Sequence, residues 1–401
     1  MLRRVLTITL AVSVMVGLLG AFSIAQQKAT LTVVGPWTGA EEELFKPVLA
    51  EAEEALGIEI EYVVYRTEDL KVLLPTQWAA KTAPGDVIFI TDVALVRKGG
   101  QEGHIADITE LVNPADFVPG SMDPVFPYAA PYTQKPKPGF WYRKSFFAAH
   151  GLEEPTTIAE FEVLLEQLKG IADLEAPIAS GDEVGWPLSD VTEHFLVTFG
   201  GPQLHKELAA CTASPRWWSV IEAIFKDFLA PWIAEGYFGE PVEWTTALTK
   251  WWEGDYGIYF MGIWLTGMVE DPVDLGLITL PGAMGVVSSI DYLFANAYSA
   301  ELDKAKELLV WLVTEGQRVQ VQQGGHFATY LPVPLELYPP VERTVAEKIK
   351  PMVPLADLDD AIGGEFQRTF WDQLKLLWVA PGRVDEVIET IREAWDAACG
   401  G

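Results

Sequence analysis

The stretch Thr30-Leu-Thr-Val-Val-Gly-Pro36 opens an alternating series of strands and helices that decides the fold class. It is a run rich in β-branched residues that ends in two turn-forming residues, a pattern typical of a buried strand. The spacing of apolar residues after it predicts an amphipathic helix over 41–55, closed by Gly57, and a second helix over 70–81.

Two more strands complete the series. Residues 58–65 alternate apolar and acidic side chains, which is typical of a strand near a sheet edge, and Asp86-Val-Ile-Phe-Ile90 predicts a buried strand. The order strand, helix, strand, helix, strand predicts an α/β fold with a parallel, doubly wound sheet. Ligands of such sheets bind beyond the carboxyl ends of the strands, so we expect Trp37 and Asp92 on the same ligand-facing rim.

After Ile90 the regular rhythm is lost, which argues against a (β/α)8 barrel. Thr157-Ile-Ala-Glu160 is a capping box that predicts a helix to about Lys169. Further helices are expected over 216–235, 301–313 and 383–398. Because there is no repeat or long linker, two lobes joined by short crossings fit better than two independent domains.

The N-terminus has the pattern of an export signal. A basic start at Arg3 and Arg4 precedes an apolar stretch, and small residues end it before a cut near Ala25. An uncleaved membrane anchor is the competing interpretation, because the apolar run approaches the length of a spanning helix. No cysteine lies near the cut, so we expect no lipid anchor and a freely diffusing periplasmic protein.

Composition sets broad limits. The formal net charge of −29 disfavours binding to nucleic acid phosphates. The hydrophobic fraction of 49% is ample for folded cores. The two cysteines, Cys211 and Cys399, fit one disulfide or two unpaired thiols equally well. No heptad seam appears, so we expect a monomer.

A search for catalytic constellations finds little. The five histidines show no metal-ligand spacing, and glycine-rich phosphate loops and nucleophile elbows are absent from the sequence. We therefore predict no enzyme activity, no cofactor and no metal. Asp357-Leu-Asp359-Asp360 lacks the spacing of a calcium loop and is interpreted as a solvated helix cap. A glycosidase with two carboxylates remains an alternative, because the 57 acidic residues offer many pairs.

Tryptophans near acidic residues indicate a binding protein instead. Trp264 follows the apolar run 258–261 at a glycine-flanked turn, and Gly185-Trp-Pro-Leu-Ser-Asp-Val-Thr-Glu193 brings Trp186 close to Asp190 and Glu193. An indole covers the C–H face of a sugar while carboxylates accept hydrogen bonds from its hydroxyls. Six other tryptophans at helical positions are expected to fill cores: Trp217, Trp218, Trp232, Trp311, Trp378 and Trp395.

In the order of its motifs the chain resembles the extracellular solute-binding proteins of carbohydrate ABC importers, in the group of maltose- and α-glucoside-binding proteins. The motifs that carry the resemblance are the opening strand with Trp37, Pro84 to Asp92, Tyr128 to Tyr132, Phe140 to Phe146, Gly185 to Glu193, Tyr259 to Trp264, Gly324 to Phe327, and Pro332 to Pro334. The segment Lys135-Pro-Lys-Pro138 departs from the pattern and is interpreted as an insertion beside the crossing into the second lobe.

The resemblance implies two α/β lobes that close around a sugar by hinge bending and deliver it to an ABC permease. Lobe 1 would comprise 26–131 and 291–331, and lobe 2 would comprise 132–290 and 332–401, after a signal peptide at 1–25. The expected ligand-binding residues are Trp37, Asp69, Asp92, Trp186, Asp190, Glu193, Trp264 and Phe327. A polyamine receptor of the same fold is a further alternative, because cationic amines also pair with carboxylates and aromatic rings.

Overall fold

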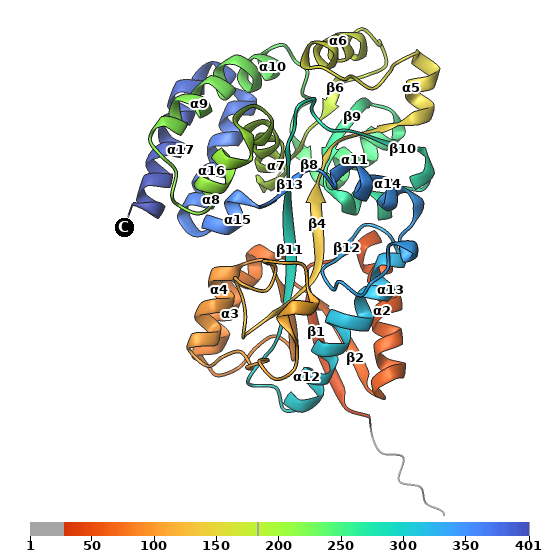
Figure 1. Cartoon of the computed structure of the whole chain (residues 1–401), viewed down its shortest axis with the longest axis vertical. Coiled ribbons are helices and arrows are strands. Elements are labelled where there is room, and N and C mark those ends of the chain that lie inside the picture. Colours follow the sequence, from red (N-terminus) through yellow and green to blue (C-terminus); the bar gives the residue numbers. More distant parts are fainter. Residues whose placement is uncertain (1–27, 183, 401) are drawn as a thin grey trace, which may run out of the picture.

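The computed structural model describes residues 28–182 and 184–400. The expected signal peptide therefore lies outside the described residues. Two α/β lobes are stacked along the long axis of the molecule, and two long strands run between them (Figure 1). The prediction of a two-lobed α/β fold is confirmed.

A seven-stranded mixed sheet with the order β12-β4-β11-β3-β1-β2 forms the lower lobe in Figure 1, except that its seventh strand, β13, pairs with the end of β11 that runs into the upper lobe. Its strands are β1 (Thr30–Gly35), β2 (Glu59–Val64), β3 (Val87–Ile90), β4 (Ala130–Lys137), β11 (Gly285–Ala295), β12 (Phe327–Ala328) and β13 (Val353–Ala356). The predicted series is confirmed at one end of this sheet, where β1 pairs in parallel with both β2 and β3 and β2 forms the edge.

Helices cover the sheet of the lower lobe. They are α2 (Ala40–Leu56), α3 (Thr67–Ala79), α4 (Val93–Gln101), α12 (Leu302–Trp311) and α13 (Gln317–Gln322). The glycine expected to close the first helix does so, because Gly57 adopts a left-handed conformation (φ 64°) and its N–H donates to the Glu53 carbonyl.

The upper lobe has a smaller sheet and more helices. Its four-stranded sheet has the order β10-β5-β9-β6, with a small β7–β8 ladder beside it. The strands are β5 (Gly139–Arg143), β6 (Ala176–Ala179), β7 (Gly181–Asp182), β8 (Val242–Glu243), β9 (Tyr256–Met261) and β10 (Leu275–Ile278). The helices are α5 (Lys144–His150), α6 (Ile158–Lys169), α7 (Trp186–Phe195), α8 (Gly201–Ala209), α9 (Arg216–Ile224), α10 (Ala230–Ala234), α11 (Trp244–Glu253), α14 (Pro340–Ile349), α15 (Leu358–Ile362), α16 (Gly364–Val379) and α17 (Val384–Cys399).

Local sequence signals in this lobe behave as expected. The Thr157 capping box is present, with both reciprocal hydrogen bonds to Glu160. All six residues of β9 are buried, as the apolar run predicts. Cys211 and Cys399 form a disulfide that joins the segment after α8 to the end of α17, which decides between the two alternatives for these cysteines.

The two long strands β4 and β11 form the crossing between the lobes (Figure 1). They pair antiparallel, and Lys135 to Lys137 lie opposite Ser289 to Val287 without a gap in the register. The expected position of Lys135-Pro-Lys-Pro138 beside the crossing is therefore wrong, because all but its last residue belong to the end of the crossing strand itself. None of the described helices is long and apolar enough to cross a membrane.

Candidate functional site

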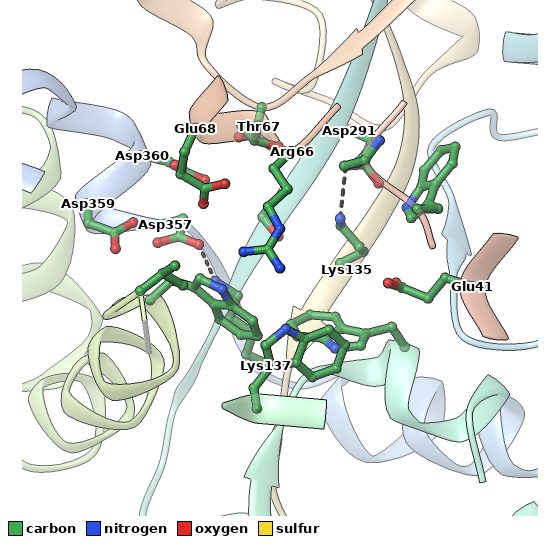
Figure 2. A pocket seen from close by; sticks show the side chains of 18 of the residues that line it. Glu41, Arg66, Thr67, Glu68, Lys135, Lys137, Asp291, Asp357, Asp359 and Asp360 are labelled. Atoms are coloured by element: carbon green, nitrogen blue, oxygen red, sulfur yellow. Dashed lines mark hydrogen bonds and ion pairs between the residues drawn. The ribbon is translucent and has the colours of Figure 1, made fainter. Parts of the chain in front are cut away.

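A cavity of about 410 Å³ lies between the lobes, and residues from both lobes and from the crossing strands line it. Figure 2 shows that charged side chains from several elements converge on this space. Five tryptophans also line it: Trp37, Trp186, Trp244, Trp264 and Trp371.

Three of these tryptophans form one cluster on the upper lobe. Trp186 lies between the other two, with ring centroids 5.6 Å from Trp244 and 5.7 Å from Trp264 and interplanar angles of 64° in both pairs. Each pair is tilted towards an edge-to-face arrangement, which aromatic rings favour. Trp186 is half-buried, so part of its ring surface is available to a ligand.

Local backbone structure sets the positions of these rings. Trp186 begins α7 directly after Gly185, whose φ of 111° places it in a conformation that favours glycine. Trp264 lies in a short 3-10 helix, Ile263–Gly267, that follows the buried strand β9. A Cβ at Gly262 would lie 1.8 Å from the Trp264 ring, so glycine is required there for the indole to occupy its place.

On the lower lobe, Trp37 follows β1 and is only 3% exposed. Its ring packs 4.7 Å from that of Phe45 and 4.8 Å from that of Phe89, measured between centroids. Most of Trp37 therefore belongs to the core, and only its edge contributes to the cavity wall. Its indole nitrogen is buried without a hydrogen-bond partner among the described residues.

Two charged side chains of the lower lobe face the cavity without ion pairs among the described residues. Arg66 and Glu68 lie at the start of α3, and Arg66 extends into the cavity in Figure 2. Guanidinium and carboxylate groups are strong donors and acceptors, respectively, for hydrogen bonds to neutral hydroxyls. The arrangement therefore offers both kinds of partner to a polar ligand.

A second charged group involves the crossing strands. Lys135 on β4 pairs with Asp291 on β11 at 2.8 Å, and its ammonium lies 5.9 Å from the centre of the Trp264 ring. Glu41 is nearby on α2, and burial raises the pKa of its carboxyl to about 7, against the lowering influence of Lys135. Lys135 thus lies between the Trp264 ring and the two acidic side chains, Asp291 and Glu41, both of which are labelled in Figure 2.

The floor of the cavity holds a buried cation with several carboxyl groups. The ammonium of Lys137 lies 2.5 Å from Asp190 and also bonds to Asp357. Burial raises the pKa of the Asp190 carboxyl to about 8, whereas the nearby Lys137 cation holds the pKa of Asp357 below its usual value although burial opposes this. One cation cannot neutralise both carboxylates, so the cluster retains a proton that isolated aspartates would lose.

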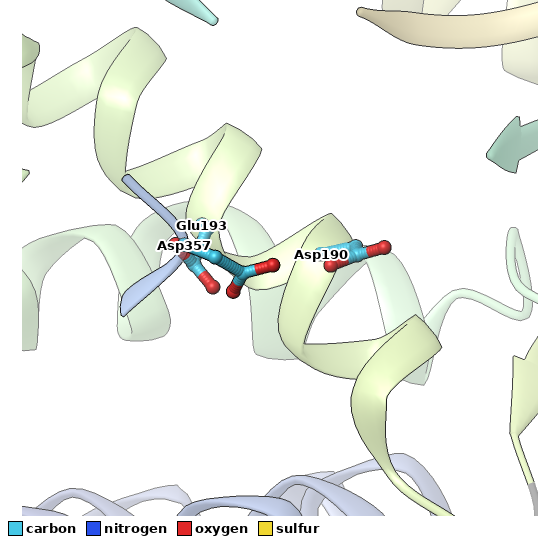
Figure 3. Close-up of side chains that lie close together, drawn as sticks. All are labelled: Asp190, Glu193 and Asp357. Carbon is cyan, nitrogen blue, oxygen red and sulfur yellow. The ribbon is translucent and has the colours of Figure 1, made fainter. Parts of the chain in front are cut away.

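Glu193 extends this cluster of buried carboxyl groups. Figure 3 shows Asp190, Glu193 and Asp357 grouped between α7 and the segment that precedes α15. Burial raises the pKa of Glu193 well above its usual value, and its carboxylate accepts from the Leu358 N–H at 2.9 Å and lies 2.6 Å from His205 Nε2. Carboxylate oxygens here approach one another closely enough to hold a cation, but the Lys137 ammonium already bonds to Asp190 and Asp357, so we assign no metal.

One polar contact joins the two lobes beside the cavity. Lys71 on α3 donates to the Gln367 side-chain oxygen on α16 at 2.8 Å, and the Gln367 amide donates to Asp360 at 3.0 Å. We call these three residues the interlobe bridge. Lys71 and Asp360 line the cavity, whereas Gln367 is buried behind them.

The chain is related in sequence to known proteins over most of its length. A family described as bacterial extracellular solute-binding protein matches residues 37–319. The chain belongs to this family. An uncharacterized ABC transporter extracellular-binding protein of Pyrococcus horikoshii is 46% identical over 375 residues, which cover 92% of this chain and 89% of the relative.

Other relatives of this solute-binding protein are more distant. An alpha-glucosides-binding periplasmic protein of Rhizobium meliloti is 29% identical over 186 residues, or 42% of this chain and 40% of the relative. The GacH receptor of Streptomyces glaucescens, solved unliganded and with acarbose, superposes with a TM-score of 0.78 at 13% identity over 93% of this chain and 99% of that chain. A maltose-bound protein of T. maritima gives a TM-score of 0.74 at 18% identity over 92% and 99%, respectively. These two structures share the fold.

The structure brings Trp37, Trp186 and Trp264 of the predicted set together at the cavity of the solute-binding protein. Asp190 lies behind them, 2% exposed and bonded to Lys137, which itself lines the cavity. The sequence analysis placed Asp190 near Trp186 but did not foresee that Lys137 lies between Asp190 and Asp357.

Four other predicted residues lie outside the cavity lining. Asp69 is exposed on α3, and Asp92 caps α4 by accepting from the Leu95 N–H at 2.8 Å. Glu193 is fully buried in the cluster below the cavity floor. Phe327 packs its ring 5.5 Å from that of Tyr338.

Asp357 is the N-cap residue of α15, as the expected helix cap at Asp357 to Asp360 requires, but the expected solvation of this segment is wrong. Asp357 and Asp359 are 6% and 3% exposed, and all three aspartates of the segment line the cavity. Lys137 donates to Asp357 and the Trp371 indole donates to Asp359, so both carboxyl groups have hydrogen-bond donors. Burial and the neighbouring Asp357 also raise the pKa of Asp359 well above its usual value, so this group is buried as the neutral acid.

Sequence reasoning also missed other cavity residues: Glu41, Arg66, Glu68, Lys135, Lys137 and Trp371. The lysines had a usable signal, since Lys135 and Lys137 are two residues apart and hence share one face of a strand. Arg66 and Glu68 follow the carboxyl end of β2, where ligand-binding residues of parallel sheets are expected.

Proposed function

We propose that this protein is a carbohydrate receptor that closes around a saccharide and delivers it to the permease of an ABC importer. The observation that carries the proposal is the cavity between the lobes, where the Trp186 cluster faces Arg66 and Glu68. Flat aromatic surface suits the C–H face of a sugar, and unpaired donors and acceptors suit its hydroxyls.

The size of the cavity is consistent with a small saccharide. About 410 Å³ lies at the lower end of the range found for small-molecule sites. We propose an α-glucoside or a disaccharide as the ligand, supported by the relative from Rhizobium meliloti, an alpha-glucosides-binding protein. In this proposal the protein acts as a monomer in the periplasm, with lobe boundaries at 26–131 and 291–331 for lobe 1 and at 132–290 and 332–401 for lobe 2.

A thermal-shift screen of the protein from residue 26 onwards tests the proposal. The panel holds α-linked disaccharides, β-linked disaccharides, monosaccharides, polyamines and amino acids. A ligand at 100 times its Kd stabilises the folded state by about 2.7 kcal/mol, which raises Tm by roughly 3 °C for a chain of this size. We expect such a rise with α-linked disaccharides and a smaller one with their β-linked counterparts.

Other outcomes overturn the proposal in different ways. A rise with spermidine alone, reduced by salt, identifies a polyamine receptor, because the cleft carboxylates would then pair with amines. Release of product from a chromogenic glycoside, abolished by replacing one cleft carboxylate, identifies a glycosidase. A rise with β-linked but not α-linked sugars keeps the receptor and refutes the α-glucoside.

A further inference from the structure

Glu342 on α14 is a buried carboxylate that does not line the cavity between the lobes. It is 1% exposed and forms no ion pair with any described residue. A buried carboxylate without a cation is costly unless hydrogen-bond donors satisfy it. The identity of its donors therefore indicates what this side chain does.

Two segments distant in sequence supply these donors. The Thr266 hydroxyl donates to Glu342 Oε1, and the backbone N–H of Gly325 donates to the same oxygen at 3.0 Å. The Gly325 N–H also lies 3.2 Å from the Thr266 hydroxyl oxygen. Glu342 Oε1, the hydroxyl and the amide thus form one group of three, whereas Glu342 Oε2 is buried without a hydrogen-bond partner among the described residues.

The group joins the 3-10 helix that carries Trp264 to the Gly324-Gly325 segment between α13 and β12. Thr266 belongs to the 3-10 helix Ile263–Gly267 and follows Trp264 by two residues. Gly325 lies between α13 and β12 in a pair with Gly324, and both have left-handed φ angles, of 80° and 82°. In Figure 1 α13 lies with the lower lobe and α14 with the upper lobe, so this group spans the lobes.

Contact between the glycine pair and Trp264 is direct. A Cβ added at Gly325 would lie 3.3 Å from the Trp264 carbonyl oxygen and 3.4 Å from its Cα. The backbone that carries the indole thus rests on the connecting segment, and the Glu342 carboxylate holds the two together. A change in the connection is therefore transmitted to the Trp264 backbone.

We propose that Glu342 is a positioning residue for Trp264: it sets the orientation of the indole in the cleft by binding both its 3-10 helix and the glycine pair. The effect on affinity rests on the proposed saccharide-binding function. The effect on the orientation of the indole does not, so the two can fail separately.

The test compares three variants. Glu342→Gln retains a side-chain oxygen that accepts both hydrogen bonds, whereas Glu342→Leu keeps a similar volume and accepts none. Thr266→Val removes the hydroxyl donor with little change in shape and gives an independent perturbation if Glu342→Leu does not fold.

Orientation is measured without ligand. The protein is labelled with 5-fluorotryptophan, and the ¹⁹F resonance of Trp264 is assigned as the one missing from Trp264→Phe. We expect this resonance to move in Glu342→Leu and Thr266→Val and to stay in place in Glu342→Gln. An unmoved resonance in both folded disrupting variants overturns the proposal.

Affinity is measured by calorimetry with the saccharide identified by the screen. We expect Glu342→Leu to weaken binding about tenfold and Glu342→Gln to weaken it less than about threefold. In a Trp264→Ala background, Glu342→Leu should change affinity by less than about twofold, because the side chain through which it acts is absent. An equal loss in both backgrounds shows a general structural role and refutes positioning of Trp264.

Discussion

Replacing Trp186 with alanine tests the cleft most sharply, because Trp186 is the central ring of the aromatic cluster and is only half-buried. Truncation of a central aromatic anchor typically costs about 2 kcal/mol of binding free energy, which corresponds to an affinity loss of about 30-fold. Each edge contact with Trp244 and Trp264 contributes about 0.5–1.5 kcal/mol, so the free energy of unfolding should fall by about 1–3 kcal/mol.

Trp217→Ala is the matched control. Trp217 is also half-buried in the upper lobe, and its indole donates to Glu207 at 2.6 Å, but it does not line the cavity. Titration calorimetry of both variants with the saccharide, beside thermal unfolding followed by circular dichroism, separates binding from stability. If Trp186→Ala folds and binds within about twofold of the unchanged protein, the aromatic cluster is not the ligand platform.

The structure makes three further predictions. Gln367→Ala breaks the interlobe bridge without removing a cavity residue, so small-angle scattering should show a larger radius of gyration in the ligand-free protein; an unchanged radius would show that the bridge does not hold the lobes together. Burial raises the pKa of Asp190 to about 8 and that of Asp360 to about 6, so the folded protein holds protons that the unfolded chain loses near pH 4. The free energy of unfolding measured in urea should therefore fall between pH 6.5 and 8.5. A rise over this window would contradict the raised pKa values. Cys211→Ser with Cys399→Ser should lower the free energy of unfolding by about 2–5 kcal/mol, since the bridge spans 188 residues; equal urea midpoints for the oxidised protein and the variant would argue against the disulfide.

Histidine titration explains why the pH prediction begins at 6.5. Burial lowers the pKa of His194 to about 3 and those of His205 and His326 to about 4. Below pH 6.5 the unfolded chain therefore binds protons at these histidines that the folded protein does not bind, so stability rises with pH there. The carboxyl and histidine effects oppose each other below pH 6.5. Above it the histidine effect fades as the unfolded-state imidazoles lose their remaining protons, and the carboxyl effect, to which Glu41 with a raised pKa of about 7 contributes, outweighs it.

Sequence signals that act over a few residues predicted their structures well. The capping box at Thr157 needs only a residue three positions away, and the left-handed cap at Gly57 needs none. The first three strands and two helices follow from the same kind of local periodicity. Placement of Trp186 and Trp264 in one cavity came from the family resemblance and not from spacing.

The charged part of the site depends on contacts that no local signal contains. Lys137 and Asp357 are 220 positions apart, and their contact exists only because β13 pairs with β11 beside β4. Without this pairing an aspartate-rich segment is expected in solvent, which is why its burial was missed. Asp92 was expected to face a ligand because it follows a strand, but the same position is also the N-cap of the next helix.

The paired and unpaired charges of the cleft have different roles in recognition. A buried ion pair such as Lys137 with Asp190 contributes little net stability compared with apolar packing, so stability alone does not account for it. Lys137 also bonds to Asp357, and these three residues come from β4, from α7 and from the position between β13 and α15, so their contacts fix the crossing strand against two elements of the cleft floor. Arg66 and Glu68 have no such partners among the described residues, so their hydrogen bonds remain for a ligand. A floor held by internal ion pairs and a wall with unpaired polar groups together suit the function that we propose, in which a neutral, hydroxyl-rich ligand completes a preorganised site.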